Sequence, residues 1–308
     1  MTNFCKPCAV GAGDRVAVLS PASPCDRSVT LQGIDELREL GFIPVFDEGI
    51  FVGEGFFAGS APYRAEAFRK AWSDPDIKAV FATRGGYGSA EILPLLKSSE
   101  IRKKRKVFVG FSDLTSLLVY LTNYCGVTCF HGPMMMNFAR GSVGYDKDSL
   151  IKALTSRTPV GEIFSSGIET LKSGENTGVL LGGTLTQLLA SLGTPYEFDP
   201  PDGYVLFLDD IGERPYRVDR MLIQLKQSGL LKRASAVVFG EFPDCQEVDC
   251  NDVRSVILRV FDDFSGPVLY GFPSGHTTGP TITLPFGVDV TVKTGSHAGI
   301  VVEEAAVT

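Results

Sequence analysis

Short apolar runs alternate with amphipathic runs over residues 15–131, and this alternation constrains the fold more than any other feature. The runs at residues 15–19, 42–46 and 79–83 are rich in β-branched and aromatic residues, and each predicts a strand. The runs between them repeat apolar residues every three or four positions, which predicts helices. Strands that alternate with helices form βαβ units, so the sequence predicts an α/β fold with a parallel sheet.

The stretch VFVGFSDLTSLL, residues 107–118, combines a predicted strand, a sharp turn and a predicted helix. Ser112 stands in the turn, after Gly110, and leucines at helical spacing follow it. A serine at such a turn is typical of a nucleophile elbow, where the helix N-terminus offers N–H groups to an oxyanion. The usual G-x-S-x-G pattern is broken here by Leu114. The alternative that Ser112 or Asp113 only caps the helix therefore stays open.

Two further segments follow predicted strands of the same sheet. RGGYG, residues 84–88, lacks the spacing of a dinucleotide loop and the lysine of a P-loop. Its glycines would instead let a backbone N–H approach a substrate carbonyl, although a plain turn is the alternative. His131 ends another strand, and we interpret it as a hydrogen-bonded histidine beside the site. Because ligands bind at the carboxyl ends of parallel strands, we expect these segments to meet at one edge.

The length of 308 residues predicts two domains. We expect an N-terminal tail at residues 1–12, an α/β nucleophile domain at 13–140 and a second domain at 177–308. Residues 141–176 are polar and rich in Gly and Ser, and we interpret them as a linker with a short helix at 148–154. The chain ends in short strands separated by Gly and Pro, which predicts a smaller, β-rich and partly barrel-like second domain.

Composition excludes several classes of partner. The net charge of -7 argues against binding to nucleic acid or to an anionic membrane surface. No apolar run approaches the roughly 20 residues that span a bilayer, and the first residues do not resemble a secretory signal, so we expect a cytoplasmic protein. Seven cysteines, an odd number, fit a reducing compartment. Cys5 and Cys8 form a C-x-x-C in the tail. With no compact zinc motif beside them, we expect no metal and no cofactor.

A serine nucleophile needs a general base, and a histidine is the usual one. His276 lies in GFPSGHTTGPTITLPFG, a long loop rich in Gly, Pro and Thr, and such loops hold functional side chains at the rim of a scaffold. His297 lies in a hairpin-like tip and is expected to be exposed. The acid that orients the base has three candidates in LFLDDIGE: Asp209, Asp210 and Glu213. The alternative role for these acids is ion pairing with the arginines that follow.

Taken together, these segments resemble the LD-carboxypeptidase family of serine peptidases, which includes murein tetrapeptide carboxypeptidases and microcin C self-immunity peptidases. The resemblance runs from GDRVAVLSPASP to the final strands. Its motifs are RGGYG, GFSDLTSLL, HGPM, GGTLTQLLASLGTPYE, LFLDDIGERPYRVDRMLIQL and GFPSGHTTGPTITLPFG. It implies an N-terminal domain like the class I glutamine amidotransferases, a smaller β-rich C-terminal domain, a Ser-His-Glu triad at their interface and a homodimer.

By this resemblance, Ser112 is the nucleophile and His276 the base, and the N–H groups of Gly86 and Asp113 form the oxyanion hole. The family's acid is usually the Glu of an L-E-D segment. Here the segment reads Leu-Asp-Asp, so Asp209 takes the position with a side chain one methylene shorter.

Glu213 is the reserve candidate for the acid. The resemblance also implies the substrate, a peptidoglycan-derived tetrapeptide that loses its terminal D-alanine during recycling in the cytoplasm. The alternatives are a microcin C-type hydrolase of peptidyl-nucleotides and a non-catalytic binding protein on the same scaffold. A cation must bind the free carboxylate of the peptide, and Arg84, Arg214 and Arg217 are candidates. Arg84, Tyr87 and Arg214 are the substrate-binding residues we expect.

Overall fold

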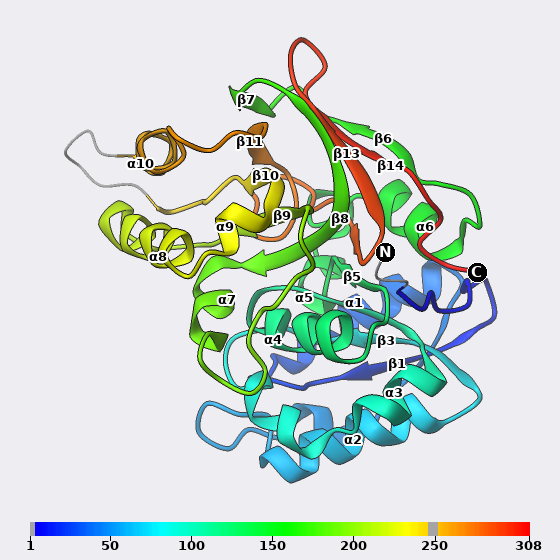
Figure 1. Cartoon of the computed structure of the whole chain (residues 1–308). Helices are drawn as coiled ribbons and strands as arrows, with labels where there is room; N and C mark the ends of the chain where they lie inside the picture. Colours follow the sequence, from blue (N-terminus) through cyan, green and yellow to red (C-terminus); the bar gives the residue numbers. More distant parts are fainter. Residues whose placement is uncertain (1–3, 246–251) are drawn as a thin grey trace.

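The computed structural model describes residues 4–245 and 252–308, which form two β-sheets flanked by helices (Figure 1). The first sheet lies in the lower half of Figure 1 and the second rises above it. No helix in the described part of the chain is long and apolar enough to cross a membrane. The prediction of an α/β fold with a parallel sheet is confirmed.

The first sheet has six strands in the order β12-β5-β4-β3-β1-β2. Strands β1 to β5 run parallel, and β12 pairs antiparallel with β5. Its strands are β1 (Arg15–Leu19), β2 (Ile43–Val45), β3 (Ile77–Ala82), β4 (Val107–Gly110), β5 (Cys129–His131) and β12 (Leu284–Phe286). The strands predicted from residues 15, 42, 79 and 107 are therefore all present in this sheet.

Helices cover both faces of this sheet because its connections reverse direction. The chain passes from β1 to its neighbour β2, and then returns across β1 to β3 and onward to β4 and β5. Right-handed crossovers then put α1 on one face and α2, α3 and α4 on the other, while α5, which follows β5, packs against α1. The helices of this half are α1 (Arg27–Glu39), α2 (Ala61–Ser73), α3 (Ser98–Lys104), α4 (Thr115–Val119) and α5 (Met135–Phe138). The reversal lies between β1 and β3, so the loops after these strands flank the crevice where such sheets bind ligands.

Local sequence explains where these helices begin and end. Asp26 caps α1 by accepting a hydrogen bond from the Val29 N–H, and Gly41 ends the helical region at a φ of +91°. The segment after RGGYG forms only a short 3₁₀ helix, η2 (Ser89–Leu95), because Pro94 interrupts it. The chain then resumes helical structure in α3.

The second sheet has eight strands in the order β6-β14-β13-β8-β9-β10-β11-β7. Its centre, from β8 to β11, is parallel, and the strands on either side are antiparallel. The strands are β6 (Gly161–Phe164), β7 (Glu169–Lys172), β8 (Glu175–Thr184), β9 (Tyr204–Asp209), β10 (Ala234–Gly240), β11 (Val268–Phe272), β13 (Asp289–Lys293) and β14 (Gly299–Val302). The helices are α6 (Lys147–Thr155), α7 (Leu185–Ser191), α8 (Pro215–Gln227), α9 (Leu230–Arg233) and α10 (Val253–Val260).

This second half differs from the expected form in two respects. The sequence predicts a partly barrel-like second half, but its sheet is open, since β6 and β7 stand at opposite ends of the strand order. The segment 141–176, expected as a linker, holds the short helix α6 and also both edge strands, β6 and β7. Edge strands are exposed on one side and need few apolar residues, so their sequences do not show the pattern of a buried strand.

The segment between β11 and β12 connects the two sheets. Strand β11 belongs to the second sheet, whereas β12 pairs with β5 in the first, with Leu284 opposite His131. The loop that carries His276 lies between them. Because both ends of the loop are fixed in sheets, the loop bridges the carboxyl edge of β4 and that of β9.

Candidate active site

Ser112 stands at the sharp turn between β4 and α4. Its φ is +65°, a left-handed conformation that is unfavourable for a residue with a Cβ atom. Strain of this kind is characteristic of a nucleophile elbow. The Ser112 Oγ lies 3.2 Å from Nε2 of His276. The turn therefore directs the hydroxyl toward a histidine from the other end of the chain.

The alternative that Ser112 or Asp113 only caps the following helix is wrong. No side chain caps α4 or the short 3₁₀ turn before it, Ser112–Leu114. The buried Asp113 carboxylate instead accepts hydrogen bonds from the N–H groups of Gly88 at 3.2 Å and Ser89 at 2.8 Å. Asp113 thus holds the end of the RGGYG loop next to Ser112.

The RGGYG loop packs directly against the nucleophile turn. A Cβ atom at Gly85 would lie 2.8 Å from the Ser112 Cβ and 3.1 Å from the Asp113 nitrogen, so only glycine fits there. Gly86 follows with a φ of +98°. Within residues 4–245 and 252–308, the N–H groups of Gly86 and Asp113 donate no hydrogen bond to a loop or a side chain. Both groups are therefore free to bind an oxyanion beside Ser112.

His276 and Asp209 form the other half of the site. The Nδ1 of His276 lies 2.7 Å from Asp209 Oδ2, and the same oxygen accepts the His276 backbone N–H at 2.8 Å. Because Nδ1 donates to the carboxylate, the neutral ring presents Nε2 as an acceptor for the Ser112 hydroxyl. Asp209 Oδ1 also accepts the Thr184 hydroxyl at 2.9 Å. Ser112, His276 and Asp209 thus form a continuous hydrogen-bonded chain.

Burial sets the electrostatics of this chain. Burial alone would raise the pKa of Asp209, but the charge and hydrogen bonds of the neighbouring imidazoles outweigh it and hold the pKa well below its usual value. Burial also lowers the pKa of His276, but the Asp209 charge outweighs this and raises the pKa above 6.5. The surroundings therefore favour the ionised form of Asp209 and the protonated form of His276.

The Asp209 carboxylate reaches His276 because the loop before His276 comes close to it. Gly275 has a φ of +75°, and a Cβ atom there would overlap Asp209 Oδ2 and contact the His131 ring. Gly240 on β10 lies against the other side, where a Cβ atom would be 3.0 Å from the Asp209 Cβ. Two glycines thus allow the backbone to compensate for the missing methylene.

The two other candidate acids point elsewhere. The buried Asp210 carboxylate accepts hydrogen bonds from the N–H and hydroxyl of Thr186 at the start of α7, and burial raises its pKa to about 6. Glu213 lies 3.6 Å from Arg217. In the described structure neither carboxylate is hydrogen-bonded to His276.

The predicted substrate-binding residues lie in both halves of the molecule. Arg84 is exposed, and its guanidinium lies 3.6 Å from where a Cβ atom of Gly86 would be. Tyr87 is also exposed and packs its ring on Phe57, at 5.6 Å between centroids. Arg214 is exposed at the N-terminus of α8, five residues beyond Asp209. Arg84 and Tyr87 therefore flank Gly86, whereas Arg214 lies in the second half.

Three supporting residues were not identified from sequence. Thr184 hydrogen-bonds Asp209, as described above. Ser23, in the loop after β1, accepts the Tyr87 N–H at 2.9 Å. Arg64 is buried and donates to the carbonyls of Gly88 at 2.7 Å and Pro21 at 2.9 Å, which ties the loops after β1 and β3 together. The sequence signal for Ser23 is its position. It lies in the Ser/Pro loop after β1, and β1 pairs with β3, the strand that precedes RGGYG.

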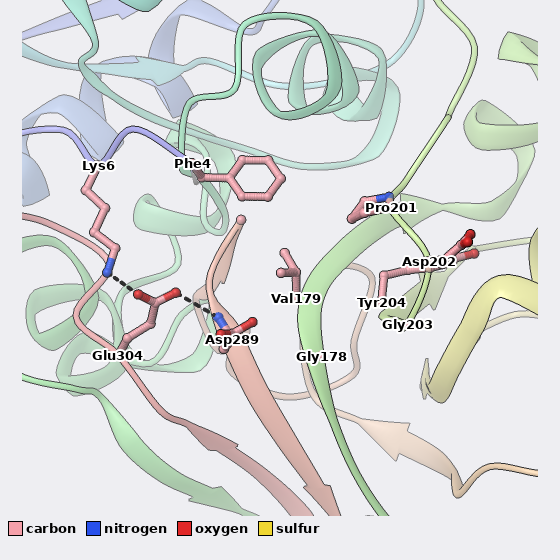
Figure 2. A pocket seen from close by; sticks show the side chains of 11 residues that line it. Phe4, Lys6, Gly178, Val179, Pro201, Asp202, Gly203, Tyr204, Asp289 and Glu304 are labelled. Carbon is pink, nitrogen blue, oxygen red and sulfur yellow. Dashed lines mark hydrogen bonds and ion pairs between the residues drawn. The ribbon is translucent and has the colours of Figure 1, made fainter. Parts of the chain in front are cut away.

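A cavity of about 370 Å³ lies away from this site (Figure 2). It is formed by the N-terminal tail, where Lys6 forms an ion pair with Glu304, and by the first residues of β9, including Tyr204. Asp209 ends the same strand, about 17 Å further along at the usual rise per residue. The cavity therefore contains none of the predicted site residues. Within the described ranges, no cluster of three or more His, Cys, Asp or Glu side chains could hold a metal ion.

Comparisons with known proteins show which family the chain belongs to. Residues 16–132 match the LD-carboxypeptidase N-terminal domain, and residues 177–292 match the LD-carboxypeptidase C-terminal domain. A probable murein peptide carboxypeptidase of Bacillus subtilis is 34% identical, over 96% of this chain and 94% of that protein.

Solved structures give the same result. The muramoyltetrapeptide carboxypeptidase from Oxalobacter formigenes is 31% identical, with a TM-score of 0.81 over 93% of this chain and 97% of that one. The Microcin C7 self-immunity protein MccF shares the fold, with a TM-score of 0.89 at 23% identity over 98% of this chain and 99% of that one. The chain is a hydrolase that belongs to the LD-carboxypeptidase family of serine peptidases.

Proposed function

We propose that this protein is a serine carboxypeptidase that removes the terminal D-alanine from an L,D-linked peptidoglycan tetrapeptide. The hydrogen-bonded chain from the strained Ser112 through His276 to the buried Asp209 is the observation that carries the proposal. Relatives named for murein peptide and muramoyltetrapeptide carboxypeptidase activity support the choice of substrate. The proposal extends to Ser112 as nucleophile, His276 as base and Asp209 as the orienting acid.

The reaction is an acyl transfer in two steps. His276 Nε2 takes the Ser112 proton as the hydroxyl oxygen attacks the scissile carbonyl, and the N–H groups of Gly86 and Asp113 bind the oxyanion. His276 then gives the proton to the leaving amine of D-alanine. Water, deprotonated by the same imidazole, hydrolyses the acyl-enzyme and frees Ser112.

Substrate recognition uses the exposed residues beside the oxyanion site. The terminal carboxylate of the peptide needs a cation, and a guanidinium can bind it through two parallel hydrogen bonds. Arg84 is our first candidate because it adjoins Gly86, and Arg214, at the start of α8, is the candidate from the second half. Tyr87, supported by Phe57, supplies an apolar surface for the peptide stem. We further propose that the reaction recycles wall peptides in the cytoplasm, as the family resemblance implies.

Mass spectrometry of the protein incubated with a muropeptide tetrapeptide tests the function. We expect the loss of one alanine. Ser112→Ala and His276→Ala should each abolish this loss while keeping the fold, and the double variant should be hardly worse than either single variant because the two residues act together.

Other outcomes of the same measurement would contradict the proposal. Cleavage of a peptidyl-nucleotide conjugate alone would favour a microcin C-type hydrolase. Binding of either substrate without turnover would favour a non-catalytic protein on this scaffold. Full activity in His276→Ala would show that His276 is not the base.

The identity of the acid is tested by two matched amide substitutions. Asp209→Asn should lower kcat by about 10²–10⁴-fold, because an amide no longer orients and stabilises the imidazole in its charged form. Glu213→Gln should cost much less, since Glu213 contacts Arg217. Steady-state kinetics of the two variants decide the assignment, and the reverse ranking would transfer the role to Glu213.

The pH profile of kcat/KM follows from the base. Only neutral His276 can accept a proton, so activity should rise with pH through the pKa of this residue. Asp209 raises that pKa, so we expect the midpoint of the acidic limb above pH 6.5. In Asp209→Asn burial acts without the opposing charge, and the midpoint should fall below 6.5. Equal midpoints in the wild-type protein and in Asp209→Asn would show that Asp209 does not influence the ionisation of His276.

We also propose, from the family resemblance, that the protein forms a homodimer. Sedimentation equilibrium at micromolar concentration should then give about twice the chain mass of 33.2 kDa. A single-chain mass under these conditions would refute the dimer and would leave the proposed site unaffected.

A further inference from the structure

His131 is a buried ionisable side chain that the acyl-transfer mechanism does not use. It ends β5, beside Gly110 of the nucleophile strand, and its side chain is completely buried. Three aromatic rings enclose it, with centroid distances of 5.7 Å to Phe111, 5.0 Å to Phe207 and 5.3 Å to Phe286. In such surroundings each ring nitrogen needs a partner, because an unpaired polar atom is costly to bury.

The hydrogen-bond partner of Nδ1 determines whether this nitrogen carries a proton. Nδ1 lies 3.1 Å from the Ser274 Oγ, two residues before His276. The Ser274 hydroxyl donates its only proton to the Ile282 carbonyl at 2.7 Å. The Ser274 oxygen can therefore only accept from the ring, so Nδ1 carries a hydrogen. This contact also fixes the loop that leads to the proposed base.

The second nitrogen, Nε2, faces the proposed acid. It lies 3.8 Å from Asp209 Oδ1 and has no hydrogen-bond partner in the described structure. With a proton already on Nδ1, a neutral ring would direct its Nε2 lone pair toward an ionised carboxylate. A ring that is protonated on both nitrogens would instead form a buried ion pair with Asp209. Nε2 would then be a donor that faces the carboxylate, and no longer a buried acceptor without a donor.

We propose that His131 is a positively charged positioning residue, which shares the negative charge of Asp209 with the base. This inference rests on the proposed function, since it acts on His276 through Asp209. The described groups that face His131 from neighbouring elements are the aromatic rings, Ser274 and Asp209. His276 and Asp210 are the ionisable side chains next to that carboxylate.

The positive charge of His131 limits how far Asp209 raises the pKa of His276. A buried carboxylate that interacts with one imidazole alone would hold the proton on that ring too strongly. A second positive charge on the opposite oxygen reduces this attraction, so His276 releases its proton at lower pH. The cluster formed by His131, Asp209 and His276 would then be neutral overall before reaction, with a base that is free to act near neutral pH.

Nuclear magnetic resonance of the wild-type protein with ¹⁵N-labelled histidine tests the charge directly. We expect both ring nitrogens of His131 to be protonated at pH 7, whereas the Nε2 of His276 loses its proton as the pH rises. His131→Gln assigns the resonances. An unprotonated Nε2 on His131 at pH 7 would overturn the proposal. The result does not depend on any substrate, so it stands apart from the test of the proposed function.

The effect on the base is measured in His131→Gln, where a neutral amide replaces the charged ring. The titration midpoint of His276, followed by the same resonances, should rise by about one pH unit. The acidic limb of kcat/KM should shift equally in an active enzyme. The control is His297→Gln, the same change at an exposed histidine, which should shift neither. A lower melting temperature with an unchanged His276 midpoint would show that His131 is only structural. If His131→Gln does not fold, His276→Ala and His297→Gln assign the other two histidines, so the wild-type spectrum still decides.

Discussion

The buried charge of Asp209 is the constraint on which the site depends. An ionised carboxylate in the interior must receive several hydrogen bonds to offset its lost hydration. Here the donors come from Thr184 at the end of β8, from the backbone and ring of His276, and from nothing local to Asp209. Because these donors lie on different strands and loops, the carboxylate holds the second sheet and the His276 loop in one arrangement.

The first sheet is joined to this arrangement because the chain returns to it in β12. The loop after β11 ends in β12, which pairs with β5, so the loop cannot move independently of the nucleophile strand. On the other side, Arg64 and the Asp113 carboxylate hold the RGGYG loop against Ser112. The proposed oxyanion donors and the proposed base are therefore each fixed by a rigid element, which a reaction dependent on preorganised dipoles requires.

An aspartate at the position where the family resemblance implies a Glu is compatible with this site. A shorter side chain serves if the backbone moves toward it, and Gly275 allows that approach because it has no Cβ atom. The close approach also brings the His276 N–H to Asp209 Oδ2, a bond that orients the base further. The replacement thus keeps the hydrogen bond to the base, and its effect on rate is a matter for the Asp209→Asn experiment.

The sequence alone determined the parallel sheet of the first half, since apolar strands and amphipathic helices are local patterns. It also indicated Ser112, His276 and the acids of LFLDDIGE, because a strained turn, a long polar loop and a strand end each leave a local signature. Which of Asp209, Asp210 and Glu213 lies against His276 depends on where the three carboxylates point, and only the packing of α7 and the Gly275 loop decides that. The edge strands within 141–176, and the contact of His131 with Asp209, arise between distant segments, so no local pattern predicts them.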